Sequence, residues 1–561
     1  MTARADAAAA APLLDVEGLR VAFDGREVVH GLSLRIMPGE CVAIVGESGS
    51  GKSVTARSLL GLAGPGSTTT AARLEVFGRD LARAGEREWR GVRGRSIGLI
   101  LQDALVSLDP LRPIGREIDD ALRIHERMPP AERRTRVIDL LDRVGMPDPA
   151  AAAGRRSGEL SGGLRQRALI AAALALDPPL LIADEPTTAL DVTVQARILA
   201  LLGEIRSRGT GILLISHDLA VVGGLADRIL VMRGGRLVEE GPAEQVLRTP
   251  RHAYTRALIA AVPTDRARGE RLSVSSAPVT GDGGSDDAVR TGDRPAPPAR
   301  TAVGERPVLR LDGVTKTFPV PGGRLAAVND VSLDVRRGET LGLVGESGSG
   351  KTTVARLALA LTAPDAGEVL LDGRPWSSLP ERERRPMRRR IGAVYQDALS
   401  SFDPRWSVRG ILDDALGTVL PRAGRRERDR RVTQLLDQVG LAASVGARRP
   451  LTLSGGQRQR VAIARALAAA PDVLICDEPV SALDVTIQAQ ILDLLDDLQR
   501  RDGLALLFIS HDLGVVRHMS DRVAVMRSGR IVETGSSDDV FGSPQHPYTA
   551  QLVADGPRLA A

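Results

Sequence analysis

The feature that most constrains the fold is an internal repeat, because segments of the second half copy segments of the first half in the same order. The string GESGSGK begins at Gly46 and again at Gly345. The string IGLILQDALVSLDP (97–110) matches IGAVYQDALSSFDP (391–404). The other matched pairs are 160–164 with 453–457, 181–191 with 474–484, and 215–218 with 509–512. Such a repeat predicts two domains of one fold and not a single large core.

A change of composition separates the two copies. Residues 264–306 are rich in Gly, Pro, Ser, Asp and Arg and have no helical or strand periodicity, so we expect a disordered linker that lets the two domains face each other. The predicted organisation is a disordered N-terminus (1–11), a first domain with a C-terminal extension (12–263), the linker (264–306), a second domain with its extension (307–556) and a tail (557–561).

Within each copy, short apolar runs alternate with helical patterns, which predicts an α/β fold. The runs 41–45, 180–183 and 211–215 each end at a Gly-rich loop or at polar residues. Runs of this kind are typical of a parallel sheet flanked by helices, with ligands at the carboxyl ends of the strands. One-face apolar spacing between the matched segments predicts a helix in each copy, through Val137, Leu140, Leu141 and Val144, and through Val432, Leu435, Leu436 and Val439.

Composition excludes several classes of protein. The richest apolar stretch, 168–183, is broken by an Asp and two Pro residues, so we expect no membrane-spanning helix, and the N-terminus lacks the apolar core of a signal peptide. Cys41 and Cys476 are isolated, which fits a reducing cytosol and excludes a disulfide framework or a cysteine metal site. A net charge of +5 with no dense basic run gives no reason to expect direct nucleic-acid binding.

Each copy contains the pattern G-x-x-x-x-G-K-[S/T], which is a phosphate cradle. Its glycines turn backbone N–H groups onto phosphates, and the following helix adds its positive N-terminal end. Only three of the 75 basic residues are lysines, a bias that suggests a GC-rich bacterial gene, yet two of the three lie here. We expect Lys52 and Lys351 to reach the β- and γ-phosphates and Ser53 and Thr352 to coordinate Mg²⁺. The two loops comprise Gly46, Glu47, Ser48, Gly49, Ser50, Gly51, Lys52 and Ser53, and Gly345, Glu346, Ser347, Gly348, Ser349, Gly350, Lys351 and Thr352.

An adjacent pair of carboxylates ends one apolar run in each copy. These pairs are Asp184–Glu185 and Asp477–Glu478. Two buried carboxylates are costly unless they are paired or used. The Asp is expected in the Mg²⁺ shell and the Glu as the general base that polarises an attacking water. The alternative is that the pair only caps the helix that follows it.

Both copies resemble ATP-binding-cassette (ABC) ATPase domains, over nearly everything outside the linker and the termini. Residues 160–164 and 453–457 are similar to the LSGGQ signature of that family. The resemblance implies two P-loop NTPase domains, each a RecA-like parallel-sheet core with an antiparallel β subdomain and a helical signature subdomain. It also implies that two ATP molecules lie head to tail, each between one Gly-rich loop and the signature of the other copy. The signature residues are Ser161, Gly162, Gly163, Ser454, Gly455, Gly456 and Gln457.

The resemblance carries over to further single positions. Gln102 and Gln396 match the Q-loop, which senses Mg²⁺ and water and faces the membrane partner. His217 and His511 match the switch position that contacts the γ-phosphate. The D-loop positions are Asp191 and Asp484, and the aromatic positions are Phe23 and Phe318, which either stack on adenine or pack in a strand core. One departure is Leu164, where the signature has Gln. Because both copies keep Lys, Asp, Glu and His, we expect two hydrolytic sites.

Two finer features resemble the peptide/nickel importer ATPases. One is the pair QDALVSLDP and QDALSSFDP, and the other is the (S/T)P-x-H-x-YT segment at 249–255 and 543–549. The resemblance implies an ATPase subunit bound peripherally at the cytoplasmic face of the membrane, with two permease subunits and an extracytoplasmic binding protein as partners and a peptide or related solute as cargo. The alternative is a tandem ABC ATPase without transport, of the ribosome-associated type. That type carries a charged helical linker, which the Pro- and Gly-rich segment 264–306 cannot form.

Overall fold

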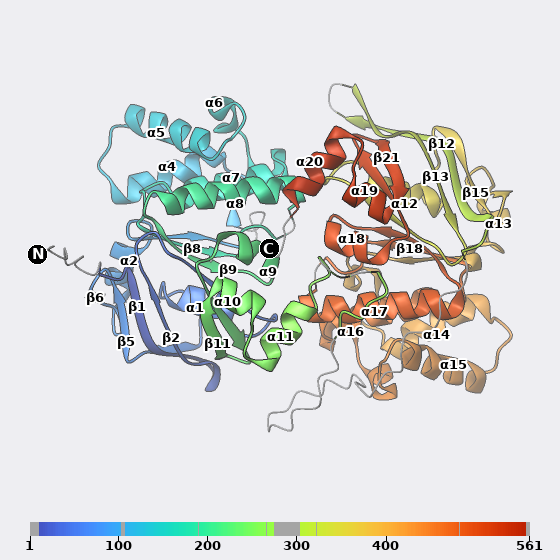
Figure 1. Cartoon of the computed structure of the whole chain (residues 1–561), viewed down its shortest axis with the longest axis horizontal. Coiled ribbons are helices and arrows are strands. Elements are labelled where there is room, and N and C mark those ends of the chain that lie inside the picture. Colours follow the sequence, from blue (N-terminus) through green and yellow to red (C-terminus); the bar gives the residue numbers. More distant parts are fainter. Residues whose placement is uncertain are drawn as a thin grey trace, which may run out of the picture. The chain divides into compact units, whose positions relative to one another are not determined.

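The computed structural model describes residues 11–102, 107–188, 190–264, 266, 268–273, 303–320, 323–481 and 483–556. The chain forms two compact units, one that ends at Ile259 and one that runs from Ala260 to Gly556. Each unit contains one copy of the repeat, drawn from blue to green for the first and from yellow to red for the second (Figure 1).

The first unit combines a mainly parallel sheet with an antiparallel sheet. The parallel sheet has the order β11-β10-β3-β9-β8-β7, with only β11 antiparallel to its neighbour, and the other sheet has the order β2-β1-β5-β6 with β4 paired to β1. The strands are β1 (Leu14–Phe23), β2 (Arg26–Ile36), β3 (Cys41–Val45), β4 (Ser67–Thr70), β5 (Arg73–Val76), β6 (Arg79–Asp80), β7 (Ile97–Ile100), β8 (Leu180–Asp184), β9 (Gly211–Ile215), β10 (Arg228–Arg233) and β11 (Arg236–Pro242).

The helices of the first unit fall into two groups. Helix α1 packs against strands of both sheets, whereas α4 to α7 pack on one another as a separate helical layer (Figure 1). The helices are α1 (Lys52–Ser58), α2 (Glu86–Val92), α4 (Ile114–His125), α5 (Pro130–Arg143), α6 (Pro149–Ala152), η1 (Ser157–Glu159), α7 (Gly162–Ala173), α8 (Val192–Ser207), α9 (Leu219–Leu225), α10 (Ala243–Arg248) and α11 (Ala253–Ala260).

The second unit repeats this architecture. Its sheets have the orders β17-β18-β19-β14-β20-β21 and β13-β12-β15-β16. The strands are β12 (Pro307–Val320), β13 (Gly323–Arg336), β14 (Thr340–Val344), β15 (Ala366–Leu371), β16 (Arg374–Pro375), β17 (Ile391–Val394), β18 (Val473–Asp477), β19 (Ala505–Ile509), β20 (Arg522–Arg527) and β21 (Arg530–Ser536). The helices are α12 (Lys351–Ala358), α13 (Glu381–Arg384), η2 (Arg388–Arg390), η3 (Leu399–Ser401), α14 (Val408–Val419), α15 (Arg425–Gln438), η4 (Ala443–Ala447), η5 (Pro450–Thr452), α16 (Gly455–Leu467), α17 (Val485–Asp502), α18 (Leu513–Met519), α19 (Ser537–Gly542) and α20 (Pro547–Asp555).

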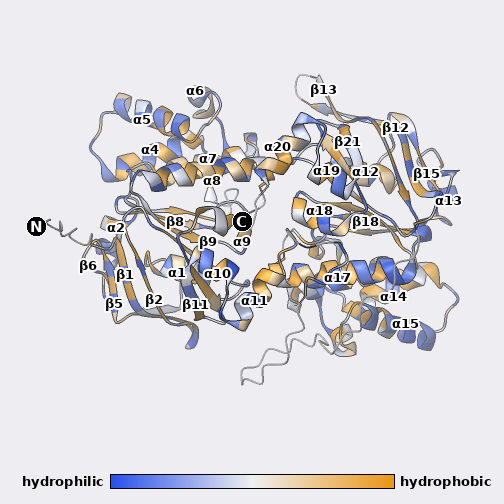
Figure 2. Cartoon of the chain, in the orientation of Figure 1, coloured by the Kyte–Doolittle hydropathy of each residue, from blue (hydrophilic) through white to orange (hydrophobic). Residues whose placement is uncertain are grey.

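The predicted α/β fold is confirmed, and the apolar runs lie where the sequence indicates. The run 41–45 is β3 and the run 211–215 is β9, and every residue of both is buried because helices and the second sheet cover the two faces. Val137, Leu140 and Leu141 form the buried face of α5. Figure 2 shows the same division, with apolar colour on strands such as β8 and β18 and mixed colour on the helices α5 and α15.

The predicted linker, 264–306, lies largely outside the described residues, so its disorder stays a prediction. Its first described residues contact α17 of the second unit. The buried Leu272 and the half-buried Ser273 donate their N–H groups to the Asp493 carboxylate at 3.0 and 2.9 Å, and Arg271 pairs with Asp497 at 3.1 Å. The predicted domain limits at 263 and 307 stay predictions. The compact unit that contains the second copy begins at Ala260 and so includes this segment.

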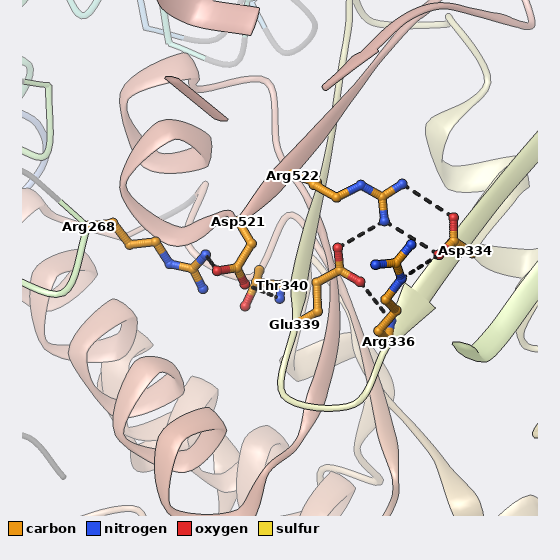
Figure 3. Close-up of polar contacts among 7 residues, drawn as sticks. All are labelled: Arg268, Asp334, Arg336, Glu339, Thr340, Asp521 and Arg522. Carbon is orange, nitrogen blue, oxygen red and sulfur yellow. Dashed lines mark hydrogen bonds and ion pairs between the residues drawn. The ribbon is translucent and has the colours of Figure 1, made fainter. Parts of the chain in front are cut away.

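The same segment also reaches the N-terminal end of β14. Arg268 forms an ion pair with Asp521, whose carboxylate accepts the N–H of Thr340 at 2.8 Å (Figure 3). Beside it, Arg522 pairs with both Asp334 and Glu339 (Figure 3). The segment therefore belongs structurally to the second unit, and it takes part in holding the first residue of β14.

Among the described residues, the helices are too short or too polar for any of them to cross a membrane. Both cysteines are free and buried in strands, as the sequence indicates.

Candidate functional site

In each unit the Gly-rich loop joins the central strand to the first buried helix. Backbone geometry explains its glycines. Gly46 has φ +153°, and a Cβ there would lie 2.2 Å from the carbonyl oxygen of Met232. A Cβ on Gly345 would likewise lie 2.1 Å from the carbonyl oxygen of Met526. A side chain at this first glycine would therefore force the loop away from its neighbouring strand.

The loop lysines hold the same position in both copies. The ammonium of Lys52 donates to the carbonyl oxygens of Gly46 at 2.7 Å and of Glu47 at 2.8 Å. Lys351 makes the same two bonds at 2.7 and 2.9 Å, to Gly345 and Glu346. Each lysine is buried, so its charge is fixed at the N-terminal end of the helix, where an anion binds well.

A hydroxyl and a buried carboxylate meet directly beside that lysine. The Ser53 hydroxyl donates to Asp184 Oδ1 at 2.8 Å, and in the second copy Thr352 and Asp477 are 3.5 Å apart. Asp184 is fully buried, and its Oδ2 has no hydrogen-bond partner among the described residues. Burial raises the pKa of this carboxyl group, the charge of Glu185 adds to the rise, and the Ser53 bond opposes it. Hydroxyl and carboxylate oxygens with a buried, unpartnered oxygen fit a hard cation such as Mg²⁺.

The second carboxylate of each acidic pair is the centre of a polar cluster. Gln102 Nε2 donates to Glu185 Oε2 at 2.8 Å, and His217 Nδ1 lies 3.3 Å from Glu185 Oε1. Glu185 has φ +49°, a left-handed backbone that costs energy for a residue with a side chain. Strain of this kind gathers at functional sites, and Glu478 shows it as well, at +51°. In the second unit, Gln396 Nε2 donates to Glu478 Oε2 at 2.9 Å, and His511 Nδ1 lies 3.2 Å from Glu478 Oε1.

The cluster favours the ionised form of the carboxylate. Burial by itself would raise the pKa of Glu185, but the hydrogen bond and charge of His217 outweigh burial, and the pKa is lowered. Burial would lower the pKa of His217, but its hydrogen bond to Glu185 and the charges of Glu185 and Asp218 together outweigh burial, and the pKa is raised. Glu478 and His511 shift in the same directions for the same causes. An ionised carboxylate is the form that can accept a proton from water.

The signature residues lie elsewhere, at the N-terminal ends of α7 and α16. Ser454 caps α16: its hydroxyl accepts the N–H of Gln457 at 3.3 Å, and the Gln457 side chain accepts the Ser454 N–H at 3.2 Å. This reciprocal capping box is missing at Ser161, because Leu164 has no side-chain acceptor. The second glycine of each signature packs on the helix after the acidic pair, since a Cβ on Gly163 would lie 2.5 Å from Val194.

The remaining predicted positions differ between the copies. Asp191 caps α8 by accepting the N–H of Val194 at 3.0 Å, and Asp484 is the N-cap residue of α17. Phe23 is partly buried against the core of its unit, whereas Phe318 is 36% exposed, with Lys316 5.9 Å from its ring centre. The core-packing alternative therefore describes Phe23 better than Phe318.

Two residues of the loop's surroundings were missed at the sequence level. Tyr254 and Tyr548 belong to the repeated (S/T)P-x-H-x-YT segments, which at the sequence level were used only as a feature that resembles the family. Their hydroxyls accept the N–H groups of Glu47 and Glu346, the second residues of the two loops, at 3.1 and 3.2 Å. The duplication of the segment was the available signal, but it did not indicate where the rings point.

Comparison with known proteins matches both units. A family described as "ABC transporter" matches residues 29–188 and 328–481, and one described as "Oligopeptide/dipeptide transporter, C-terminal region" matches 238–279 and 532–561. The peptidoglycan transport ATP-binding protein YejF of Agrobacterium fabrum is 42% identical over 97% of this chain and 96% of its own length. The oligopeptide transport ATP-binding protein OppD of Mycobacterium tuberculosis is 41% identical over 98% of both chains. The glutathione import ATP-binding protein GsiA of Salmonella choleraesuis is 42% identical over 97% of this chain and 89% of its own.

Proposed function

Because the chain belongs to the ABC transporter family, with both cassettes and both oligopeptide/dipeptide transporter C-terminal regions in one polypeptide, we propose that it is the ATPase subunit of a peptide-type importer. The observation that carries this proposal is the pair of C-terminal regions, since the cassettes alone are common to many ATPases. Relatives named for oligopeptide, glutathione and peptidoglycan transport support cargo of peptide character.

Each unit supplies the groups that ATP hydrolysis needs. Loop N–H groups and Lys52 or Lys351 bind the phosphates. Glu185 or Glu478 accepts the proton of the attacking water. His217 or His511 holds that carboxylate and faces the γ-phosphate. Two complete sets support hydrolysis at both sites.

The acidic pairs also offer a site for Mg²⁺. In the first unit the ligands are Ser53, Asp184 and Gln102, and the unpartnered Oδ2 of Asp184 supports their use for a cation. In the second unit they are Thr352, Asp477 and Gln396. When bound, Mg²⁺ neutralises phosphate charge that builds up during transfer.

Head-to-tail pairing of the cassettes completes each ATP site. The loop at 46–53 shares one nucleotide with Ser454 to Gln457, and the loop at 345–352 shares the other with the signature that begins at Ser161. Serine hydroxyls and helix N-termini are suited to the γ-phosphate. ATP thereby favours the closed pair and hydrolysis releases it, so the difference in affinity drives transport.

The partners follow from this role. Two permease subunits receive the motion through the Q-loop region, an extracytoplasmic protein delivers the solute, and this chain binds the cytoplasmic face of the membrane peripherally. The ribosome-associated alternative is disfavoured by the C-terminal regions, which are described for transporters.

The proposal is tested by trapping the closed state with Glu185→Gln and Glu478→Gln and purifying the tagged chain with ATP from detergent-solubilised native membranes. We expect two multispanning permeases to copurify in stoichiometric amounts, and the wild-type chain without ATP is the control. Ribosomes or nucleic acid in place of permeases would overturn the importer.

A further inference from the structure

The C-terminal extension of each unit makes a direct bond to its own Gly-rich loop. Tyr254 lies on α11 and Glu47 on the loop after β3, 207 residues apart in the sequence. Tyr548 on α20 makes the same bond to Glu346. Two copies with different surrounding sequences keep the contact within 0.1 Å of each other, at 3.1 and 3.2 Å.

The bonded N–H belongs to a peptide group that the loop lysine also holds. The peptide between Gly46 and Glu47 carries the Gly46 carbonyl on one side and the Glu47 N–H on the other, because a trans peptide points them in opposite directions. Lys52 donates to that carbonyl at 2.7 Å, and the Tyr254 hydroxyl accepts from that N–H. One peptide plane is therefore fixed from both sides, and each bond polarises the other.

The rest of the repeated segment places the tyrosine. Glu239 of β11 accepts the N–H groups of Arg251 and His252 at 2.6 and 3.0 Å. The Nδ1 of His252 then accepts the N–H of Tyr254 at 3.1 Å at the start of α11. In the second unit Glu533, Gln545, His546 and Tyr548 make the same set of bonds.

The ring of each tyrosine is held as well. Tyr254 is 6% exposed, and the guanidinium of Arg233 lies 4.9 Å from its ring centre. Arg233 follows Met232, whose carbonyl oxygen would lie 2.2 Å from a Cβ on Gly46. Tyr548 is 4% exposed, with Arg527 at 4.7 Å. A buried, stacked ring leaves the hydroxyl little freedom, so it holds a defined place beside the loop.

We propose that Tyr254 and Tyr548 are positioning residues that preorganise the phosphate-binding loop of their own unit and so couple the C-terminal extension to ATP binding. This inference rests on the proposed assignment of residues 46–53 and 345–352 to the phosphates. The repeated segment would then act in the ATPase cycle. Displacement of α11 or α20 would break the tyrosine bond to the loop peptide whose carbonyl accepts from the lysine.

The test uses Tyr254→Phe and Tyr548→Phe in the full chain, which remove one hydroxyl and keep the ring. The first measurement is hydrogen exchange, followed by mass spectrometry, of the peptides that contain Glu47 and Glu346. We expect Tyr254→Phe to speed exchange in the first loop only and Tyr548→Phe in the second only, so each variant controls the other. Exchange in α11 and α20 is expected to stay unchanged.

The second measurement is MgATP binding and turnover. Loss of one hydrogen bond predicts affinity about two- to tenfold weaker at the affected site, seen as a higher KM with a smaller change in kcat. Unchanged loop exchange and unchanged KM in both variants would overturn the proposal. If Lys52→Ala and Lys351→Ala together leave ATP binding intact, the loop assignment itself fails, and that outcome is distinct from failure of the tyrosine role.

Discussion

Arg268, in the segment that follows the first cassette, forms an ion pair with Asp521 of the second cassette (Figure 3). The first cassette makes the corresponding pair internally, where Arg206 of α8 contacts Asp227 at 3.3 Å. Asp227 accepts the N–H of Cys41, as Asp521 accepts that of Thr340. In α17 the position that matches Arg206 is Gln499, so the second cassette takes its guanidinium from the preceding segment.

Replacement of this guanidinium is expected to loosen the second cassette. Arg268→Ala removes a charged partner of the Asp521 carboxylate and should destabilise that cassette by about 1 to 2 kcal/mol. Hydrogen exchange in β14 should accelerate while β3 is unchanged. The matched control is Arg206→Ala, which should speed exchange in β3 and leave β14 unchanged. If Arg268→Ala speeds exchange in both strands equally or in neither, the pairing is contradicted.

Each carboxylate that we propose as a general base is expected to serve its own site. Glu185→Gln or Glu478→Gln keeps the side-chain volume but removes the proton acceptor, so either single variant should lose the turnover of one site. The double variant should fall by about 100-fold or more and still bind ATP. Phosphate release at saturating MgATP measures this, with filter binding of ATP as the control. Complete loss in one single variant would show that the two sites hydrolyse ATP only together.

Because the capping box is missing at the first signature, Leu164→Gln is predicted to raise the stability of the first cassette. The amide would accept the N–H of Ser161, as Gln457 does for Ser454, and should stabilise the first cassette by about 1 kcal/mol. Thermal unfolding checks this, and Gln457→Leu should cost the second cassette a similar amount. No stabilisation by Leu164→Gln together with no loss in Gln457→Leu would show that the box has no energetic role.

The two cysteines are expected to be unreactive in the folded protein. Burial raises the pKa of the Cys41 thiol to about 12, and burial raises that of Cys476 as well, so neither thiolate forms near neutral pH. Iodoacetamide at pH 8 should label neither thiol until denaturant is added, and mass spectrometry would then find both labelled. Fast labelling of the native chain would contradict this burial.

The controls for the labelling experiment come from the repeat itself. Cys41 matches Thr340 at the start of β14, and Cys476 matches Ala183 in β8. Cys41→Thr and Cys476→Ala therefore introduce the residues that are buried at the matching positions of the other copy. The double variant should fold and hydrolyse ATP normally.

The sequence by itself determined the repeat, the parallel strands and the positions of the Gly-rich loops and the acidic pairs. Those patterns are local: apolar runs specify buried strands, and the glycines, the lysine and the helix start of each phosphate cradle are consecutive in the sequence. Residues 41–45 and 211–215 accordingly lie in the predicted strands. The acidic pairs could be placed at strand ends because the carboxyl ends of parallel strands meet at one edge.

The tertiary structure alone decided which distant groups touch. The bond from Glu47 to Tyr254 spans 207 residues, and the pair of Arg268 with Asp521 joins the predicted linker segment to the start of the interior strands β14 and β20. Neither contact leaves a periodic signal, because each depends on where the chain returns in space and on the direction of one side chain. The same reason separates Phe23, packed on its core, from Phe318, which is exposed, although both positions match the same family residue.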